Sequence, residues 1–142
     1  MKRRKDERGS SAAVELALLA PLLGALALVV IFGGRLALAR HTVQAATADA
    51  ARAASIERTA ADARRSATRI ANATMNNQGL TCTTTTTEVD TRGFKRPPGT
   101  PATVTVTISC QLATADLSLP IPATIQVTAT SSSELDLYRG RG

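Results

Sequence analysis

The chain has 142 residues, of which 2% are aromatic, so it has room for one small domain and few bulky side chains to build a core, which disfavours a large enzyme. The formal net charge of +6 divides into +3 from residues 1–9 and +3 spread thinly over residues 40–142, while Glu15 and Arg35 cancel. Only Phe94 and Tyr138 are available to stack on bases, so we expect no nucleic-acid partner.

An apolar segment occupies residues 12–34, with Glu15 as its one charge. As a helix its 23 residues would reach about 35 Å, which is enough to cross a bilayer. Five Lys/Arg precede it, whereas the next 18 residues hold only Arg35, Arg40 and Arg52. The positive-inside rule therefore predicts a single-pass protein of the cytoplasmic membrane, with a cytoplasmic N-terminus and the remainder outside.

Two other interpretations of this segment stay open. The residues from Ala37 to Ala39 form an A-x-A pattern that a signal peptidase could cut, giving a secreted chain that starts at Arg40. The apolar run is longer than the 7–15 residues typical of a signal, which argues against cleavage there. An uncleaved single-span anchor is the simpler alternative.

Residues 41–79 are rich in alanine, contain no proline and carry charges at helical spacing. They predict a helix that continues out of the membrane and stops at Gly79. From Ser11 to Asn77 it would approach 100 Å, with Pro21 and the Ser/Asn patches as places where it could break. Its small residues favour docking against partner helices, and a solvated stalk is the alternative; they are Ala46, Ala50, Ala53, Ala60 and Ala67.

After Gly79 the hydrophobic period changes to two, which is typical of half-buried strands. Strands are predicted in residues 80–90, 101–112 and 122–130, with a Gly/Pro-rich loop at 91–101. The predicted inward faces are Val104, Val106, Ile108, Cys110 and Leu112 in the second strand and Ala123, Ile125, Val127 and Ala129 in the third. The sequence therefore predicts an α+β fold, in which a long N-terminal helix precedes a small antiparallel sheet packed against the end of that helix.

The two cysteines lie symmetrically about the predicted loop, because the midpoint of Cys82 and Cys110 is residue 96. A symmetric hairpin would place them opposite each other, which predicts a cross-strand disulfide in an extracytoplasmic domain. Two unpaired thiols or a metal site are the alternatives. With one histidine and no further cysteine, a metal cluster is not expected.

Catalytic chemistry has no recognisable basis in the sequence. The only histidine, His41, follows the apolar segment, and nothing near it in sequence forms a nucleophile and base pair with it. No paired carboxylates or Gly-rich phosphate loop can be found. We expect no enzyme activity, no cofactor and no metal.

The basic leader ending in Gly9, the run "RGSSAAVELALLAP" and the continuation "GRLALARHTVQAATADAARAAS" resemble the TadE family, pseudopilins of the tight-adherence (Flp) pilus machinery. The resemblance covers roughly residues 8–55. It implies a pilin-like fold, removal of residues 1–9 by a prepilin peptidase on the cytoplasmic side, Ser10 as the mature N-terminus, and packing with other pilins or pseudopilins and a membrane assembly platform. It also implies that Glu15 assists recognition or assembly.

For Glu15 two roles compete. After cleavage, the carboxylate could pair with the α-amino group of a neighbouring helix, which would neutralise two charges at the membrane. Alternatively it snorkels to the headgroups and needs no partner. The family usually has its glutamate fifth after the cleaved glycine; with Ser10 counted first, Glu15 is sixth, so a cut after Ser10 is the alternative to one after Gly9.

The sequence thus predicts a minor pseudopilin with a structural role, and an uncleaved membrane-anchored binding module is the runner-up. Membrane lipid is an expected partner in both cases. The expected organisation is a leader at 1–9, a transmembrane helix at 10–38, an extracytoplasmic helix at 39–79, a Thr-rich β domain at 80–131 and a flexible tail at 132–142.

Overall fold

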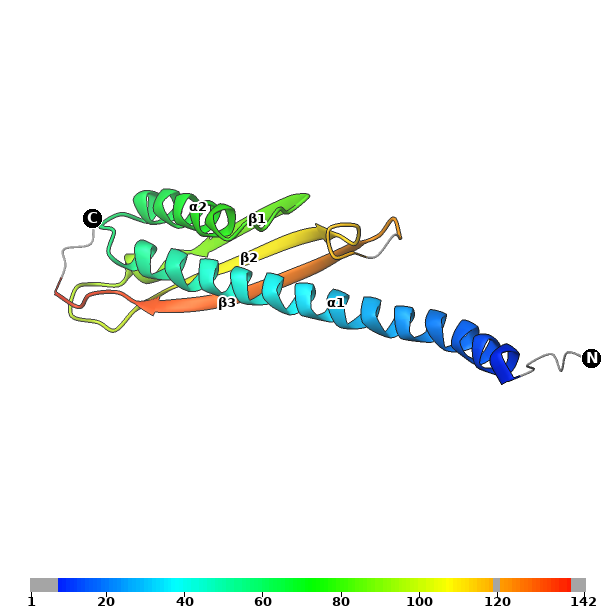
Figure 1. Ribbon diagram of the computed structural model, residues 1–142. Helices are drawn as coiled ribbons and strands as arrows, with labels where there is room; N and C mark the ends of the chain where they lie inside the picture. The colour runs from blue at the N-terminus through cyan, green and yellow to red at the C-terminus, as the bar shows by residue number, and fades with distance from the viewer. Residues whose placement is uncertain (1–7, 119–120, 139–142) are drawn as a thin grey trace, which may run out of the picture.

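The computed structural model describes residues 8–118 and 121–138. Two helices lie on one face of a three-stranded antiparallel sheet, and the first helix projects far beyond it (Figure 1). The elements, in chain order, are α1 (Arg8–Ser55), α2 (Ala60–Asn77), β1 (Thr84–Asp90), the short 3-10 helix η1 (Arg92–Lys95), β2 (Thr103–Ala113) and β3 (Thr124–Glu134). The predicted α+β fold is confirmed.

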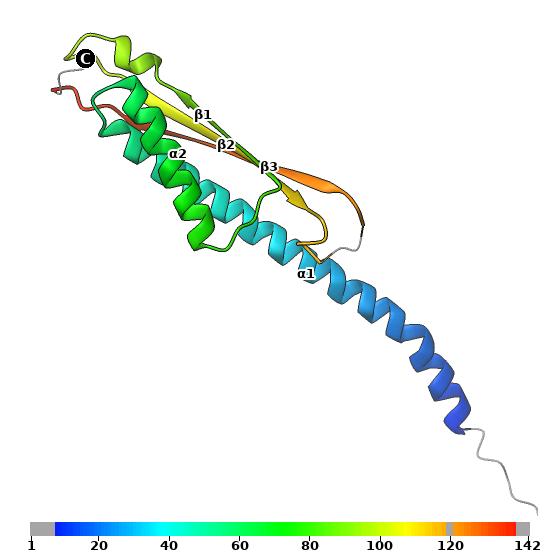
Figure 2. The same ribbon diagram turned by 90° about the horizontal axis from the view of Figure 1, so that it is seen from above.

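Helix α1 has two halves with different surroundings. It runs for 48 residues without a break, and Pro21 lies inside it. From Val14 to Ile31 every residue is exposed, whereas from Phe32 onward the side chains of one face pack on the rest of the chain. Figure 2 shows the bare half projecting away from the α/β domain. The helix continues without a break past residue 38, where the sequence predicts that it leaves the membrane.

The expected single helix to Asn77 is wrong, because the chain turns between Ser55 and Ala60 and α2 folds back along α1. α1 ends at Ser55, and Thr59, just before α2, has an extended conformation with φ −118° and ψ 151°. Its hydroxyl accepts a 3.1 Å hydrogen bond from the Asp62 backbone N–H, so it caps α2. A strong capping residue placed between two alanine-rich segments starts a new helix there.

The C-terminus of α2 follows the sequence prediction. Gly79 has φ +69°, a left-handed conformation that glycine adopts without a Cβ clash. The Leu80 N–H donates to the Met75 carbonyl and the Gly79 N–H donates to the Asn76 carbonyl, which is the Schellman arrangement. The chain then reverses into the sheet.

The two helices meet through alanine side chains. Ala46, Ala50 and Ala54 of α1 and their counterparts on α2 are fully buried, and the α2 residues are Ala63, Ala67 and Ala71. Small side chains let two helix backbones approach closely, which compensates for the little apolar area that each one buries. Docking is therefore the correct alternative for this segment, and the partner helix belongs to the same chain.

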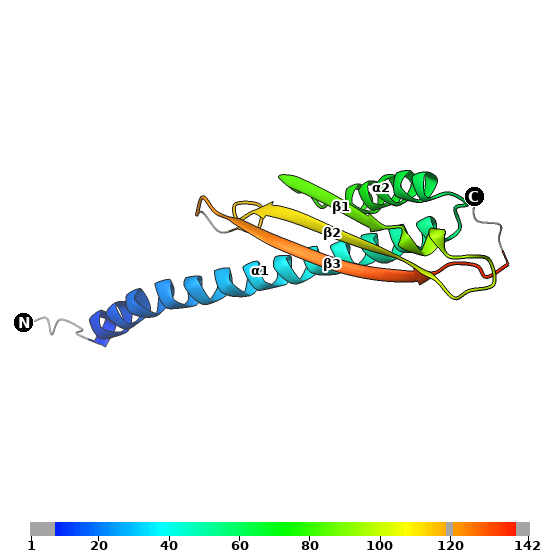
Figure 3. The same cartoon turned by 180° about the vertical axis from the view of Figure 1, so that it is seen from behind.

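The sheet has the order β1-β2-β3, with β2 in the centre. The five predicted inward residues of β2 are at most 2% exposed, and Val127 of β3 is buried between the partly buried Ile125 and Ala129. Ala123 is exposed, because it lies just before β3. The opposite face, which Figure 3 shows, carries hydroxyl pairs that cross from β2 to β3. These are Thr105 with Ser132, Thr107 with Thr130, and Ser109 with Thr128, at 2.8–3.0 Å.

The ends of the β region differ from the expected ones. β1 begins at Thr84 instead of residue 80, and β3 continues to Glu134, so the tail expected to be flexible from residue 132 begins as strand. Leu135 is 5% exposed and donates its N–H to the Ala102 carbonyl. The buried Leu135 holds the chain against the core just after the serines at residues 131–133, so β3 continues through them to Glu134. Residues 1–7 of the predicted leader and residues 139–142 of the predicted tail lie outside the described residues.

Candidate assembly surface

The largest unpartnered surface is the apolar half of α1. The helix is long and apolar enough to cross a membrane, with a mean hydropathy of 2.6 over its most apolar window, none of which is buried. The 18 exposed residues from Val14 to Ile31 rise about 27 Å. Such a surface requires cover by lipid or by other helices. One candidate span near the N-terminus fits a single-pass membrane protein.

Glu15 lies at the start of this surface. It is exposed, and no hydrogen bond or ion pair joins it to another described residue. The next charge along the helix is Arg35, twenty residues later, which places the two side chains about 30 Å apart along the axis. This rise is similar to the thickness of the hydrocarbon core of a bilayer.

The predicted cleavage residues belong to the same helix. Gly9 and Ser10 are the second and third residues of α1, and their side chains fall outside the described part of the chain. The N–H groups of a first helical turn have no intrahelical acceptor, so this turn unwinds at low cost.

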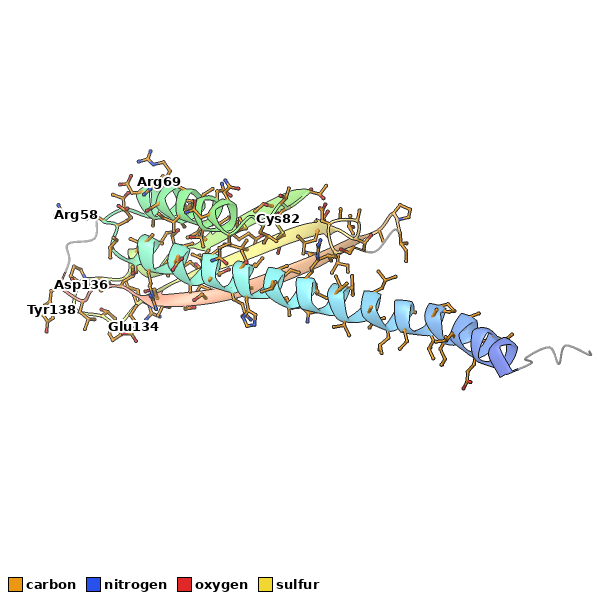
Figure 4. The ribbon with its side chains drawn as sticks, in the orientation of Figure 1. Arg58, Arg69, Cys82, Glu134, Asp136 and Tyr138 are labelled. Atoms are coloured by element: carbon orange, nitrogen blue, oxygen red, sulfur yellow. A yellow bond between two sulfur atoms is a disulfide. The ribbon has the colours of Figure 1, made fainter. Side chains whose placement is uncertain are left out.

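Cys82 and Cys110 form a disulfide, with their Cα atoms 5.5 Å apart. The argument from hairpin symmetry is wrong in register, because Cys110 lies opposite Thr85 and Cys82 lies two residues before β1. The actual pairing places Thr84 opposite Gln111, so the hairpin centre is shifted toward the C-terminus. The bond therefore fastens the segment between α2 and β1 to the buried face of the central strand. Cys82 is labelled in Figure 4.

The end of the domain farthest from the bare helix is rich in charge. Arg92 donates to both carboxylate oxygens of Asp90, and this hydrogen bonding lowers the pKa of Asp90 to about 2. The pair lines an open pocket of about 650 Å³ together with Arg96, Glu134 and residues of both strand ends. Figure 4 shows Glu134, Asp136 and Tyr138 at this end of the molecule. Sequence reasoning missed this pocket, because its residues come from three separate segments.

Arginines gather on the exposed side of α2. Arg64 donates to the Thr91 hydroxyl at 2.9 Å, and Arg65 forms an ion pair with Asp62. The Thr59 hydroxyl and then Arg65 lower the pKa of Asp62 by hydrogen bonding to its carboxylate. Arg58 and Arg69 point away from the domain (Figure 4). Thr59 caps α2, and the hydrogen bond from Arg64 joins α2 to the residue before η1.

Nothing in the described chain resembles a catalytic centre. His41 is exposed on α1, within the packed half of the helix. Within residues 8–118 and 121–138, no group of three His, Cys, Asp or Glu side chains is placed to hold a metal ion.

Comparison with known proteins bears on the bare helix. Residues 11–52 match the model of the family described as TadE-like protein. The N-terminal segment is TadE-like. The match begins within the first turn of α1, includes Glu15 and all of the exposed apolar stretch, and ends three residues before the helix does. No curated protein and no solved structure matches the chain. The match suggests a role related to the Tad/Flp pilus, in a context of other pilins, and it does not include α2 or the sheet.

Proposed function

We propose that the protein is a minor pseudopilin of a tight-adherence (Flp-type) pilus or a related secretion system, with a structural and assembly role and no catalytic activity. The observation that carries the proposal is the uncovered apolar half of α1, which lies within the TadE-like segment. A helix of this kind can rest in the membrane as a monomer and later pack against the helices of other pilins. The α/β domain would then lie outside the cell, carried by the continuous α1.

Processing is the first step of the proposed pathway. A prepilin peptidase on the cytoplasmic side would cut after Gly9, or after Ser10, within the first turn of α1. Removal of the basic leader takes away five Lys/Arg and leaves a single α-amino group at the start of the apolar helix. The subunit could then move out of the membrane with much less charge to transfer.

Glu15 would guide assembly. Its carboxylate has no partner among the described residues, and it can pair with the new α-amino group of an adjacent subunit. Such a pair is most valuable where the surroundings are apolar, because each charge alone would be costly there. The assembly platform and other pilins are the partners that this step requires.

The test of this proposal is the N-terminal residue and intact mass of the protein from membranes and from sheared surface material, with and without the prepilin peptidase. A peptidase-dependent start at Ser10 or Ser11 supports the pathway and decides the scissile bond. A start at Met1 in both strains refutes it.

Glu15→Ala tests the assembly role, and Leu16→Ala, at a neighbouring position that is 68% exposed, is its matched control. We expect Glu15→Ala to be retained in the membrane and reduced in the sheared fraction, and Leu16→Ala to resemble the wild type. If Glu15→Ala accumulates uncleaved, the carboxylate serves peptidase recognition. Equal behaviour of both variants would reduce Glu15 to a tolerated charge at the membrane edge.

A second candidate is an uncleaved membrane-anchored binding module. The pocket beside Asp90 and Arg92, at the end of the domain farthest from the exposed half of α1 (the distal pocket), favours it. The pocket offers opposite charges side by side, with Asp90, Glu134, Arg92 and Arg96 among its lining residues. A polar or zwitterionic ligand would match this lining. An intact leader in cells with active peptidase, together with loss of surface adhesion in Glu134→Gln, would favour this function over the first.

A further inference from the structure

The exposed side of α2 carries several arginines around one open hollow. The hollow measures about 450 Å³, and its lining consists of three exposed arginines and a threonine, namely Arg64, Arg65, Arg69 and Thr68. We call the three arginines the α2 arginine cluster. Residues 63–87 contain no Asp, Glu or Lys, and the carboxylate of Asp62 pairs with Arg65. The cluster therefore keeps an excess of positive charge on this side of α2.

The stability of α2 does not account for the placement of these arginines. The dipole of a helix favours basic side chains in its last turn, and α2 has none there. Arg65 and Arg69 lie one turn apart on the same side of the helix, where like charges repel each other. An anion bound between these guanidinium groups would remove the repulsion.

The cluster retains hydrogen-bond donors for a ligand, because each guanidinium has five N–H groups. Arg64 donates to the Thr91 hydroxyl at 2.9 Å, and Arg65, whose side chain is 78% exposed, pairs with Asp62. No hydrogen bond or ion pair joins Arg69 to another described residue, and its side chain points away from the domain (Figure 4). Donors therefore remain for several acceptor oxygens.

The cluster lies away from the apolar half of α1, as Figure 1 and Figure 2 both show. α1 rises about 36 Å from Ile31 to Ser55, and α2 returns only about 14 Å before it reaches Arg69. Arg69 is therefore roughly 20 Å beyond the exposed apolar stretch, outside the headgroup layer of a bilayer that this stretch spans. This distance excludes the phospholipids of that bilayer as the anionic partner.

The surroundings of the cluster distinguish among the remaining anionic partners. α2, which the structure describes in full, has no aromatic residue to stack on nucleic-acid bases. It exposes no large apolar side chain, whereas the centre of a protein interface is apolar or aromatic. The hollow is open and a single helix lines it, so it does not enclose a small anion. A hydrophilic polymer with repeated anionic groups matches such a surface.

We propose that the α2 arginine cluster binds an anionic polysaccharide, through ion pairs between its guanidinium groups and the carboxylate, sulfate or phosphate groups of the polymer. The hydroxyl of Thr68, in the same lining, adds a hydrogen-bonding group for sugar hydroxyls. This contact goes beyond the proposed pilus role. It does not depend on leader cleavage or on filament assembly.

The test uses the full-length protein in detergent, with alginate, a polyuronate, as the probe in the absence of calcium. The rate at which phenylglyoxal modifies each arginine is measured by mass spectrometry, so α2 is observed separately from the basic leader. Arg40, which is exposed on α1, is the internal control. We expect alginate to slow the modification of Arg65 and Arg69 and to leave that of Arg40 unchanged. Sodium chloride should abolish the protection, because salt screens exposed charges.

Two matched variants give the size of the effect. Arg69→Ala should raise the Kd for alginate, measured from the protection of Arg65, by about threefold. Arg40→Ala, which removes the same charge elsewhere, should leave this Kd unchanged. An equal Kd for wild type and Arg69→Ala overturns the proposal.

Three other results also overturn the proposal. The first is equal protection of Arg40 and Arg69, or protection of neither, and the second is protection that persists at high salt. The third is stronger protection by poly-L-glutamate than by alginate at equal carboxylate concentration, which assigns the cluster to an acidic protein. A mature start at Met1 would refute the pilus pathway without changing any of these measurements, so the two proposals fail separately.

Discussion

The Cys82–Cys110 disulfide allows a quantitative prediction about the stability of the α/β domain. The two residues are separated by 28 positions, and the ring that they close contains all of β1, η1 and most of β2. For a ring of about 29 residues, the loop-entropy relation gives about 3.6 kcal/mol of stabilisation at 25 °C. The domain has a small core whose helix seam consists of alanines, so this is a large share of its stability.

We expect reduction of the wild-type protein, or the Cys82→Ala/Cys110→Ala double variant, to lower the unfolding midpoint by roughly 15 °C for a domain of about 100 residues. The assay is protease resistance and circular dichroism of the full chain in detergent as temperature rises. Reduced wild type isolates the cross-link itself, because Cys110 is fully buried and its replacement also removes packing. Thr85→Ala, at the exposed position opposite Cys110, is the matched control.

A loss below about 1 kcal/mol on reduction would refute the loop-entropy reasoning, since the ring would then constrain little of the unfolded chain. A large loss in the double variant with none in reduced wild type would assign the effect to the packing of Cys110 instead. An equally large loss in Thr85→Ala would show that the strand pairing, and not the bond, is critical.

Gly93→Ala should destabilise the domain by about 1–3 kcal/mol, measured by urea unfolding, because an added Cβ would lie 2.3 Å from the Thr103 carbonyl oxygen; unchanged stability would mean that η1 moves freely. Thr59→Ala should lower the free energy of unfolding by about 1 kcal/mol, because the cap of α2 is lost. It should also raise the pKa of Asp62 toward its usual value, which NMR titration measures. An unshifted titration would contradict the role of the Thr59 hydroxyl. The folded pKa of Asp90, about 2, lies below its unfolded value near 3.9, so the stabilisation that Asp90 contributes is present above pH 4 and is lost as pH falls toward 2. Asp90→Asn should therefore flatten this part of the plot of unfolding free energy against pH. An unchanged plot would contradict this prediction.

Several features followed from local sequence alone. The apolar run with Glu15 and Arg35 at its edges specifies a helix of membrane length, because hydropathy and rise per residue depend on no distant contact. The alternation from Val104 to Leu112 specifies a strand with one buried face, since successive side chains of a strand point to opposite sides. Gly79 specifies the end of α2 for an equally local reason, its left-handed backbone.

The sequence did not determine how these elements meet. The break at Thr59 competes with strong helix propensity on both sides, and it prevails because α2 can bury Ala63, Ala67 and Ala71 against α1. The strand register depends on the whole sheet and the helices under it, so the symmetric placement of Cys82 and Cys110 about residue 96 gave the wrong alignment. The lining of the distal pocket and the hydrogen bond from Arg35 to the Asp116 carbonyl bring together residues that are far apart in the chain. Only the tertiary structure decides such juxtapositions, because they result from the packing of complete faces and not from the preference of any single segment.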